Sequence, residues 1–207
     1  MSITFPIAMP SAPGFQKFNL VAENIVGVSK SPFTLQAQTY QWPGECWTLD
    51  ATLPPMHIDQ AQAWVTFLVS LRGRLGTFYV GDEANASPAG VATGTPLVNG
   101  AQSAMSSTLA TKGWTTNTTG ILKAGDYIQL GTGASQRLYK VLADANSDSS
   151  GHAALDIFPR LREGVSDSQA ITIAACKGTF RLIANNRQWS VDEARMYGID
   201  LKCEEAI

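Results

Sequence analysis

Apolar and polar residues alternate along residues 33–53, and this period of two constrains the fold more than any other feature of the chain. Successive side chains of a β-strand point to opposite faces, so the alternation predicts strands with one buried face. The sequence WPGE at residues 42–45 has turn chemistry, because proline fixes φ and glycine tolerates positive φ. We therefore predict two strands joined by a turn there. The apolar positions of the two strands are Phe33, Leu35, Ala37, Trp47, Leu49, Ala51 and Leu53.

The period changes after Pro54 and Pro55. Apolar residues now recur every three or four positions over residues 58–71, which predicts one amphipathic helix that ends at Gly73. Core packing explains the large side chains of this region better than a cofactor site, because a helix that covers a sheet needs an apolar face. A strand is expected at residues 77–80. The large side chains assigned to the core are Met56, Trp64 and Phe67.

Composition shifts abruptly over residues 82–107 to Ala, Gly, Ser, Pro, Thr and Asn, which indicates a domain boundary or an extended arm. Beyond it, short apolar segments are separated by glycines and polar turns. Such spacing predicts a small all-β unit, a barrel or a sandwich. Its strands are expected at residues 127–130, 137–142, 155–158 and 171–174.

The C-terminal segment alternates most regularly of all and predicts a two-stranded hairpin that turns at Asn185 and Asn186. Its regularity matches that of residues 30–80. We therefore predict one domain from residues 1–82 plus 178–207, with residues 83–177 inserted as a small β domain; such insertion is easy when the two ends lie close together. The apolar positions of the hairpin are Phe180, Leu182, Tyr197, Ile199, Leu201 and Cys203.

Charge argues against nucleic acid as a specific partner. The chain has 15 Lys and Arg against 17 Asp and Glu, a formal net charge of −2, so it lacks the field that gathers phosphates. Two short basic clusters, Arg72 with Arg74 and Arg160 with Arg162, end apolar segments. We interpret both as solvated ends of elements rather than as phosphate or partner contacts.

The sequence predicts a soluble protein made in a reducing cytoplasm, without membrane insertion. No basic start followed by an apolar stretch indicates a secretory signal, and the apolar run over residues 64–71 is far shorter than the ~20 residues that cross a bilayer. Cys46, Cys176 and Cys203 are odd in number and form no C-x-x-C pair, which fits neither a disulfide framework nor a zinc site.

No motif predicts an active site, so we expect no catalytic, cofactor-binding or metal-binding residues. His57 and His152 lack a partner at metal-ligand spacing. A capping or packing role at the helix start suits His57, and His152 lies in a polar loop. A hydrolase that uses Asp144, Asp148 or Asp156 is a weak alternative, because no converging groups are visible.

A partial calcium motif is formed by Asp144, Asn146 and Asp148, three oxygen ligands at alternate positions. The match then fails, because Ser149 replaces the glycine of the sharp turn and Leu155 replaces the closing glutamate. A polar hairpin connection without metal is the favoured interpretation, since the same residue types form such turns.

Two stretches resemble phage tail proteins: ECWTLDATLPPMHIDQAQAWVTFLVSLRGRLGTFYVGD at residues 45–82 and KGTFRLIANNRQWSVDEARMYGIDLKCEEA at residues 177–206. They look like the two halves of the ring-forming domain of distal tail and minor tail proteins in phages with long noncontractile tails. The resemblance implies a mainly β fold: a β-sandwich-like ring domain with one α-helix, and an inserted small β-barrel of the oligosaccharide-binding type. Its residues are packing residues without a catalytic signature.

The resemblance also implies a function. Copies of the chain would form a ring, hexameric by analogy with a six-fold tail tube, that joins the tail tube protein to the tip hub or central fibre in the virion tail. One alternative is another tail connector or adaptor. A second is a carbohydrate-binding module in which Trp114, Tyr127 and Tyr139 stack on host sugars, although buried core aromatics explain these residues equally well.

Overall fold

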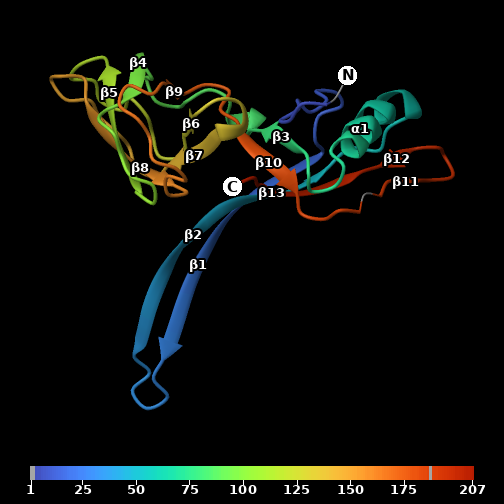
Figure 1. The fold of residues 1–207 in the computed structure, drawn as a ribbon, viewed down its shortest axis with the longest axis horizontal. Coiled ribbons are helices and arrows are strands. Elements are labelled where there is room, and N and C mark those ends of the chain that lie inside the picture. The colour runs from blue at the N-terminus through green and yellow to red at the C-terminus, as the bar shows by residue number, and fades with distance from the viewer. Residues whose placement is uncertain (1–2, 187) are drawn as a thin grey trace.

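A computed structural model describes residues 3–186 and 188–207. The fold is mainly β with one α-helix, as the sequence predicts, and it contains a nearly closed six-stranded, barrel-like sheet (Figure 1). A second sheet has five strands, and a short ribbon has two. The elements in chain order are β1 Lys17–Lys30, β2 Ala37–Thr52, α1 Ile58–Ser70, β3 Thr77–Val80, β4 Gly94–Val98, β5 Thr108–Trp114, β6 Tyr127–Leu130, β7 Arg137–Val141, β8 Ala153–Phe158, β9 Ile171–Thr172, β10 Gly178–Leu182, β11 Ser190–Val191, β12 Tyr197–Gly198 and β13 Asp200–Glu205.

The five-stranded sheet has the order β1-β2-β13-β10-β3. One face of it buries alternate residues of β13 and of the second half of β2, while β10 is buried at four of its five residues. α1 contributes a stripe at helical spacing to the same core. Both periodicities read from the sequence therefore meet in one hydrophobic cluster. Its large members are Trp47, Leu49, Leu53, Met56, Trp64, Phe67, Leu68, Phe78, Phe180 and Leu201.

The predicted turn at residues 42–45 is wrong. β2 continues through it, and the chain turns instead at residues 31–36, where the Ser31 N–H donates to the Gln36 carbonyl at 2.9 Å. The register passes from Asn24 opposite Glu45 to Val26 opposite Gln41, so two steps on β1 face four on β2. Residues 42–44 of β2 thus form a bulge. A bulge, like a turn, accommodates a proline that lacks an N–H and a glycine.

The C-terminal prediction is partly right. β10 and β13 are antiparallel neighbours, with Phe180 opposite Glu205 and Leu182 opposite Cys203. The connection, however, is not a tight turn at Asn185 and Asn186, because the β11–β12 ribbon lies between the two strands. β13 also pairs with β2, so it is the central strand of the five-stranded sheet.

The barrel-like sheet has the order β4-β5-β8-β7-β6-β9. Its ends approach each other, because the Val98 N–H donates to the Gln169 carbonyl and the Ser168 N–H to the Val98 carbonyl, both at 2.9 Å. The strands predicted here are confirmed, that of residues 127–130 with identical bounds. β4, within residues 82–107, was not predicted as a strand.

The chain leaves and re-enters the five-stranded sheet at one place. Val80 at the end of β3 pairs with Gly178 at the start of β10, so the ends of residues 83–177 lie side by side. A separate hydrophobic cluster fills the barrel, while Tyr127, Leu138 and Cys176 join the cluster of the five-stranded sheet. The division into one domain of residues 1–82 plus 178–207 and an inserted domain of residues 83–177 remains a prediction.

Gly81, directly after β3, tests how closely the chain approaches the segment that precedes β10. A Cβ added there would lie 2.2 Å from the Cys176 carbonyl oxygen, whereas one added at Gly14 would meet nothing within 4 Å. We expect Gly81→Ala to lower stability by about 1 to 3 kcal/mol through overpacking, and Gly14→Ala to leave it unchanged. Thermal melting of the two variants measures the difference; equal melting temperatures would contradict the close crossing.

Candidate functional site

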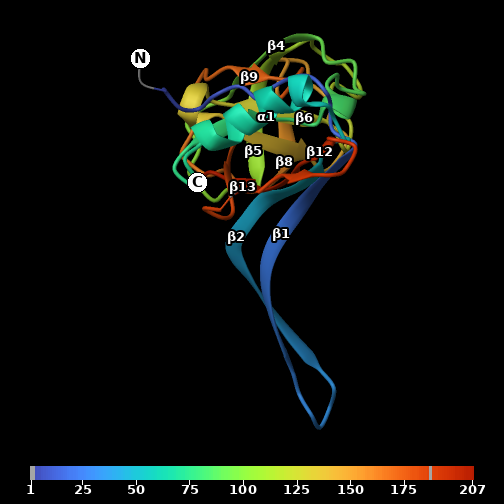
Figure 2. The ribbon, with the colours of Figure 1, turned by 90° about the vertical axis from the view of Figure 1, so that its right-hand side faces the viewer.

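A β-hairpin arm leaves the body of the molecule, and it is the most conspicuous surface of the fold (Figures 1 and 2). We define the arm as residues 24–44. β13 pairs with β2 only over Thr48–Thr52, so the arm has no third strand on either edge among the described residues. At about 3.3 Å per residue, the seven residues from Asn24 to Lys30 alone extend roughly 23 Å.

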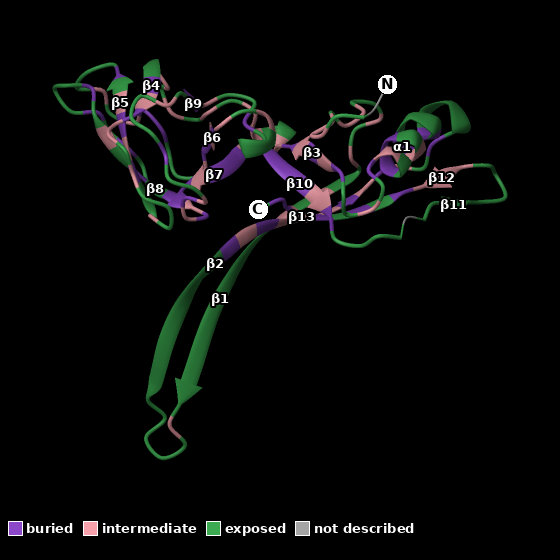
Figure 3. Ribbon diagram, viewed as in Figure 1, coloured by how far each residue is buried: buried purple, intermediate pink, exposed green. Residues whose placement is uncertain are grey.

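The arm is apolar and almost uncharged, yet exposed (Figure 3). Lys30 is the one charged residue in its sequence. Soluble monomers rarely show apolar patches of this extent, and open strand edges are normally protected by charge or cover. The arm therefore has the chemistry of a surface that another protein covers. Its large apolar side chains, with their exposed fractions, are Ile25 59%, Val26 49%, Val28 65%, Phe33 94%, Leu35 66%, Tyr40 61% and Trp42 52%.

Both faces of the arm carry apolar groups. Tyr40 lies opposite Gly27, and its ring meets that of Trp42 edge-on with centroids 4.7 Å apart. Val26 and Val28, at alternate positions, lie on the other face. A partner on one side alone would leave one of these faces in water. The arrangement suits an arm that lies between protein surfaces.

Sequence reasoning predicted alternation here but not exposure. The prediction that the strand face of Phe33 and Leu35 is half-buried is wrong, because both side chains lie in the exposed loop that ends the arm. β1 was missed because Leu20, Val21 and Ala22 follow one another without a period of two. The composition of this segment could have predicted the exposed arm. Its apolar residues occupy both odd and even positions, and it has a single charged residue.

Trp47 anchors the base of the arm. Its side chain is 4% exposed, and its Nε1–H donates to the Leu138 carbonyl of β7 at 3.1 Å. Its ring meets Phe158 edge-on at 4.9 Å between centroids. This indole therefore joins β2 to two strands of the barrel, β7 and β8, by one hydrogen bond and one aromatic contact.

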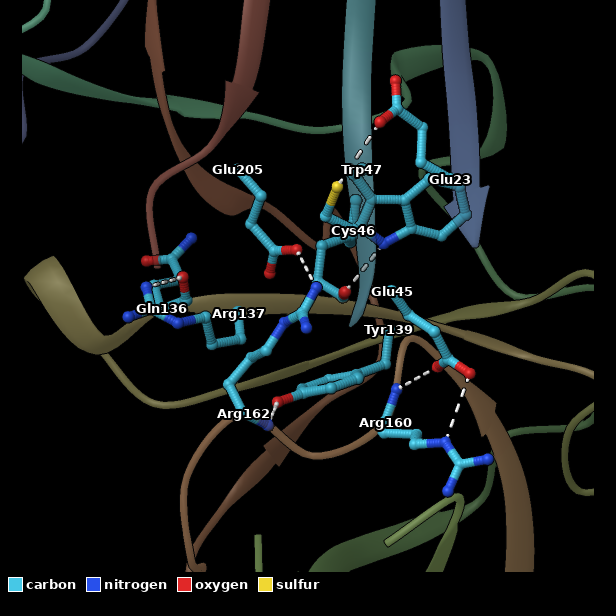
Figure 4. Close-up of polar contacts among 11 residues, drawn as sticks. Glu23, Glu45, Cys46, Trp47, Gln136, Arg137, Tyr139, Arg160, Arg162 and Glu205 are labelled. Carbon is cyan, nitrogen blue, oxygen red and sulfur yellow. Dashed lines mark hydrogen bonds and ion pairs between the residues drawn. The ribbon is translucent and has the colours of Figure 1, made fainter. Parts of the chain in front are cut away.

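Glu45 forms a second link between the arm and the barrel (Figure 4). It is 6% exposed, and its carboxylate accepts from the Arg160 backbone N–H at 2.8 Å and from Arg160 Nε at 3.2 Å. Gln41, on the arm, donates to the same carboxylate at 3.0 Å and accepts from Arg160 Nη2 at 3.3 Å. Arg160 thus holds two residues of β2 on either side of the bulge.

Arg162 and Glu205 form a buried ion pair beside this link, 2.8 Å apart, with side chains 5% and 1% exposed. The Arg162 backbone N–H donates to the Tyr139 hydroxyl at 3.3 Å, and burial raises the pKa of that hydroxyl. Burial, and then the charge of Glu23, likewise raise the pKa of the nearby Cys46 thiol. The predicted solvated role is therefore wrong for Arg162, and also for Arg160, which is bonded to Glu45 and Gln41. It is confirmed for Arg72 and Arg74, which are exposed.

The two histidines lie apart from this junction. His57 stands at the N-cap position of α1, where its carbonyl accepts from the Gln60 and Ala61 amides. Its side chain makes no capping bond and is exposed, so the predicted capping or packing role is wrong. His152 is in the exposed loop between β7 and β8, with Nδ1 3.8 Å from the Asp148 carboxylate. Hydrogen bonds from the His152 and Ser150 amides lower the pKa of Asp148.

The partial calcium motif serves as a connection between antiparallel strands, as predicted. Its oxygens accept from backbone amides of different segments: Asp144 from Ala124 at 2.9 Å, and Asn146 from Gly120 at 2.7 Å. Asp148 accepts within its own loop. Over residues 3–186 and 188–207, no group of His, Cys, Asp and Glu is placed to hold a metal, and no helix is long and apolar enough to cross a membrane.

The aromatic residues considered for sugar stacking are part of the core. Trp114, Tyr127 and Tyr139 are 4%, 6% and 2% exposed. Trp114 Nε1 donates to the Thr111 hydroxyl, and Tyr127 contacts the Trp47 ring. Their interpretation as buried core residues is confirmed. Tyr40 and Trp42 on the arm, in contrast, form an aromatic pair that is exposed.

A scan against protein-family models and a search of curated proteins both return no match to this chain.

Trp47 and Trp42 lie five residues apart on one strand and should respond differently to truncation. We expect Trp47→Ala to lower the free energy of unfolding by about 3 to 5 kcal/mol, because it removes a buried indole from the arm base. Trp42→Ala, at an exposed site, should change it by less than about 0.5 kcal/mol. Chemical denaturation of both variants tests this. A similar loss in both would contradict the anchoring role of Trp47.

Glu205 and Glu204 offer a second matched pair on β13. Glu205→Ala leaves the Arg162 charge buried without its partner, and we expect a loss of about 3 to 5 kcal/mol. Glu204 pairs with Arg74 at 2.8 Å, but their side chains are 33% and 51% exposed, so Glu204→Ala should cost under about 1 kcal/mol. Urea unfolding distinguishes the two. An equal, small effect would show that the buried pair does not hold the barrel to the sheet.

Proposed function

We propose that this chain is a structural protein of a bacteriophage tail tip, where copies form a ring between the tail tube and the tip hub or central fibre. The observation that carries the proposal is the exposed apolar arm. The role is structural rather than catalytic, and the protein is made in the host cytoplasm before it enters the virion.

The arm supports assembly for energetic reasons. A partner that covers the arm removes apolar surface from water, which favours binding. Because the arm has almost no charge, binding avoids the high cost of desolvating ions. Lys30 is the single exception on the arm. Because both faces are apolar, the arm suits a position between neighbouring subunits. Contacts that use two different surfaces close into a ring when the rotation per subunit divides a full turn.

The sequence resemblance supports the identity of the assembly. The residues that carry it, 45–82 and 177–206, supply residues 45–52 of β2 together with α1, β3, β10 and β13. By that resemblance the ring is hexameric, and its neighbours are the tail tube protein and the hub or fibre proteins. Another connector of the tail would use the arm in the same way.

The carbohydrate-binding alternative loses the residues on which it was based. Trp114, Tyr127 and Tyr139 are buried and face core neighbours, so they offer no stacking surface. Two of the three carboxylates considered for hydrolysis, Asp144 and Asp148, accept hydrogen bonds from backbone amides.

Val28 provides the test of assembly through the arm. Val28→Asp places a charge on an exposed side chain, so we expect unchanged melting and a loss of the ring. Leu75→Asp, at a residue 68% exposed on the body, should leave the ring intact. Sedimentation and negative-stain microscopy across a concentration series measure both. A stable two-fold dimer that buries the arm, or a ring unaffected by Val28→Asp, would contradict the proposal.

A further inference from the structure

A cavity of about 290 Å³ lies under the N-terminal segment. Its walls come from residues 8–15, from Trp64 of α1 and from residues 81–86, together with residues 175–177. Trp64 is 1% exposed, and its indole N–H has no hydrogen-bond partner among the described residues. This N–H is itself enclosed by protein atoms, so the cavity meets the ring of Trp64 and not its polar atom.

The cavity has the size for an aromatic side chain. A cavity of about 150 Å³ is sufficient for a benzene ring in a protein interior. The space beside Trp64 is larger than that, and Phe15 contributes a second aromatic wall, with its ring 5.6 Å from that of Trp64. An inserted phenyl ring would therefore meet aromatic edges and faces, which attract one another.

Phe33 is the matching group on the same chain. It is 94% exposed in the loop that ends the arm. The loop is held in shape, because the Ser31 Oγ accepts from the Phe33 and Thr34 amides, each at 3.3 Å. A pre-formed loop loses little conformational entropy on binding. The arm points away from the N-terminal segment in both views, so Phe33 cannot reach the cavity of its own chain (Figures 1 and 2).

Charge supports the same match. Asp82 and Glu83 line the cavity with a single basic residue, Lys177, which gives this wall a net negative charge. Lys30, the one charge of the arm, stands three residues before Phe33. An inserted tip would therefore bring its cation toward the acidic side of the cavity.

We propose that Phe33 of one copy inserts into the cavity beside Trp64 and Phe15 of the next copy. This contact rests on the proposed self-assembly and specifies how it is made. It joins two different surfaces of the chain, so it propagates in one direction around a ring instead of pairing two subunits symmetrically.

Photocrosslinking tests the contact in the full-length assembled protein. Phe33 is replaced by p-benzoylphenylalanine, which keeps an aromatic ring at the tip, and the products are mapped by mass spectrometry after irradiation. We expect adducts between copies that fall in residues 8–15, 64 or 81–86. The same amino acid at Leu75, an exposed residue of the body, should give none in these segments. Adducts elsewhere within an intact ring overturn the contact but leave the ring; a protein that stays monomeric overturns both.

Two variants give an independent readout. Phe33→Ala should raise the concentration at which half the protein assembles by about ten- to a hundredfold, because a buried phenyl ring is lost, with melting of the monomer unchanged. Ala86→Phe fills the cavity and should have a similar effect, whereas Ala86→Ser leaves the cavity open and should assemble normally. If Phe33→Ala reaches half-assembly at the same concentration as the wild type, the contact is overturned. This outcome does not depend on whether the cavity variants fold.

Discussion

The contact between Trp47 and the barrel is the interaction on which the rest of the structure depends. β2 belongs to the five-stranded sheet at one end and to the arm at the other, and Trp47 lies where these parts meet. Its hydrogen bond to Leu138 and its edge-on contact with Phe158 fix this strand to the barrel. Because Glu45 and Gln41 then hold Arg160, the direction in which the arm leaves the body is set by side chains and not by the backbone of a free hairpin.

This arrangement explains how the apolar hairpin stays extended in a chain that has no partner. A two-stranded ribbon alone is marginally stable in water. Here its base is one end of a strand whose other half is central in a sheet, and the bulge at residues 42–44 is braced by a buried carboxylate. The arm is thus kept extended before it has a partner. Little ordering is then required when a partner covers it, so more of the apolar burial contributes to assembly.

Local periodicity predicted the parts of the fold that bury one face. The alternation from Trp47 to Leu53 and the helical stripe of residues 58–71 both correspond to observed elements, because in each case a single core decides which residues must be apolar. The same alternation failed at Phe33 and Leu35. Alternation of apolar and polar residues predicts which way the side chains point. It does not predict whether this protein or another one covers them.

The junction could not be predicted because its partners are remote in sequence. Arg160 and Glu45 are 115 residues apart, and nothing in either neighbourhood indicates the other. Proline and glycine at residues 43 and 44 were equally ambiguous, since a turn and a bulge require the same backbone freedom. A basic cluster at the end of an apolar segment likewise becomes solvated or buried according to what the rest of the chain places against it.

Hydrogen–deuterium exchange of the arm measures the central claim most directly. In dilute protein the unpaired edge amides of residues 24–44 should exchange rapidly, while those of β13 remain protected. In the assembled ring the same arm amides should become protected, because neighbouring subunits exclude water from them. Rapid exchange of the arm in an intact assembly would show that this surface is not where the copies meet, and it would contradict the account.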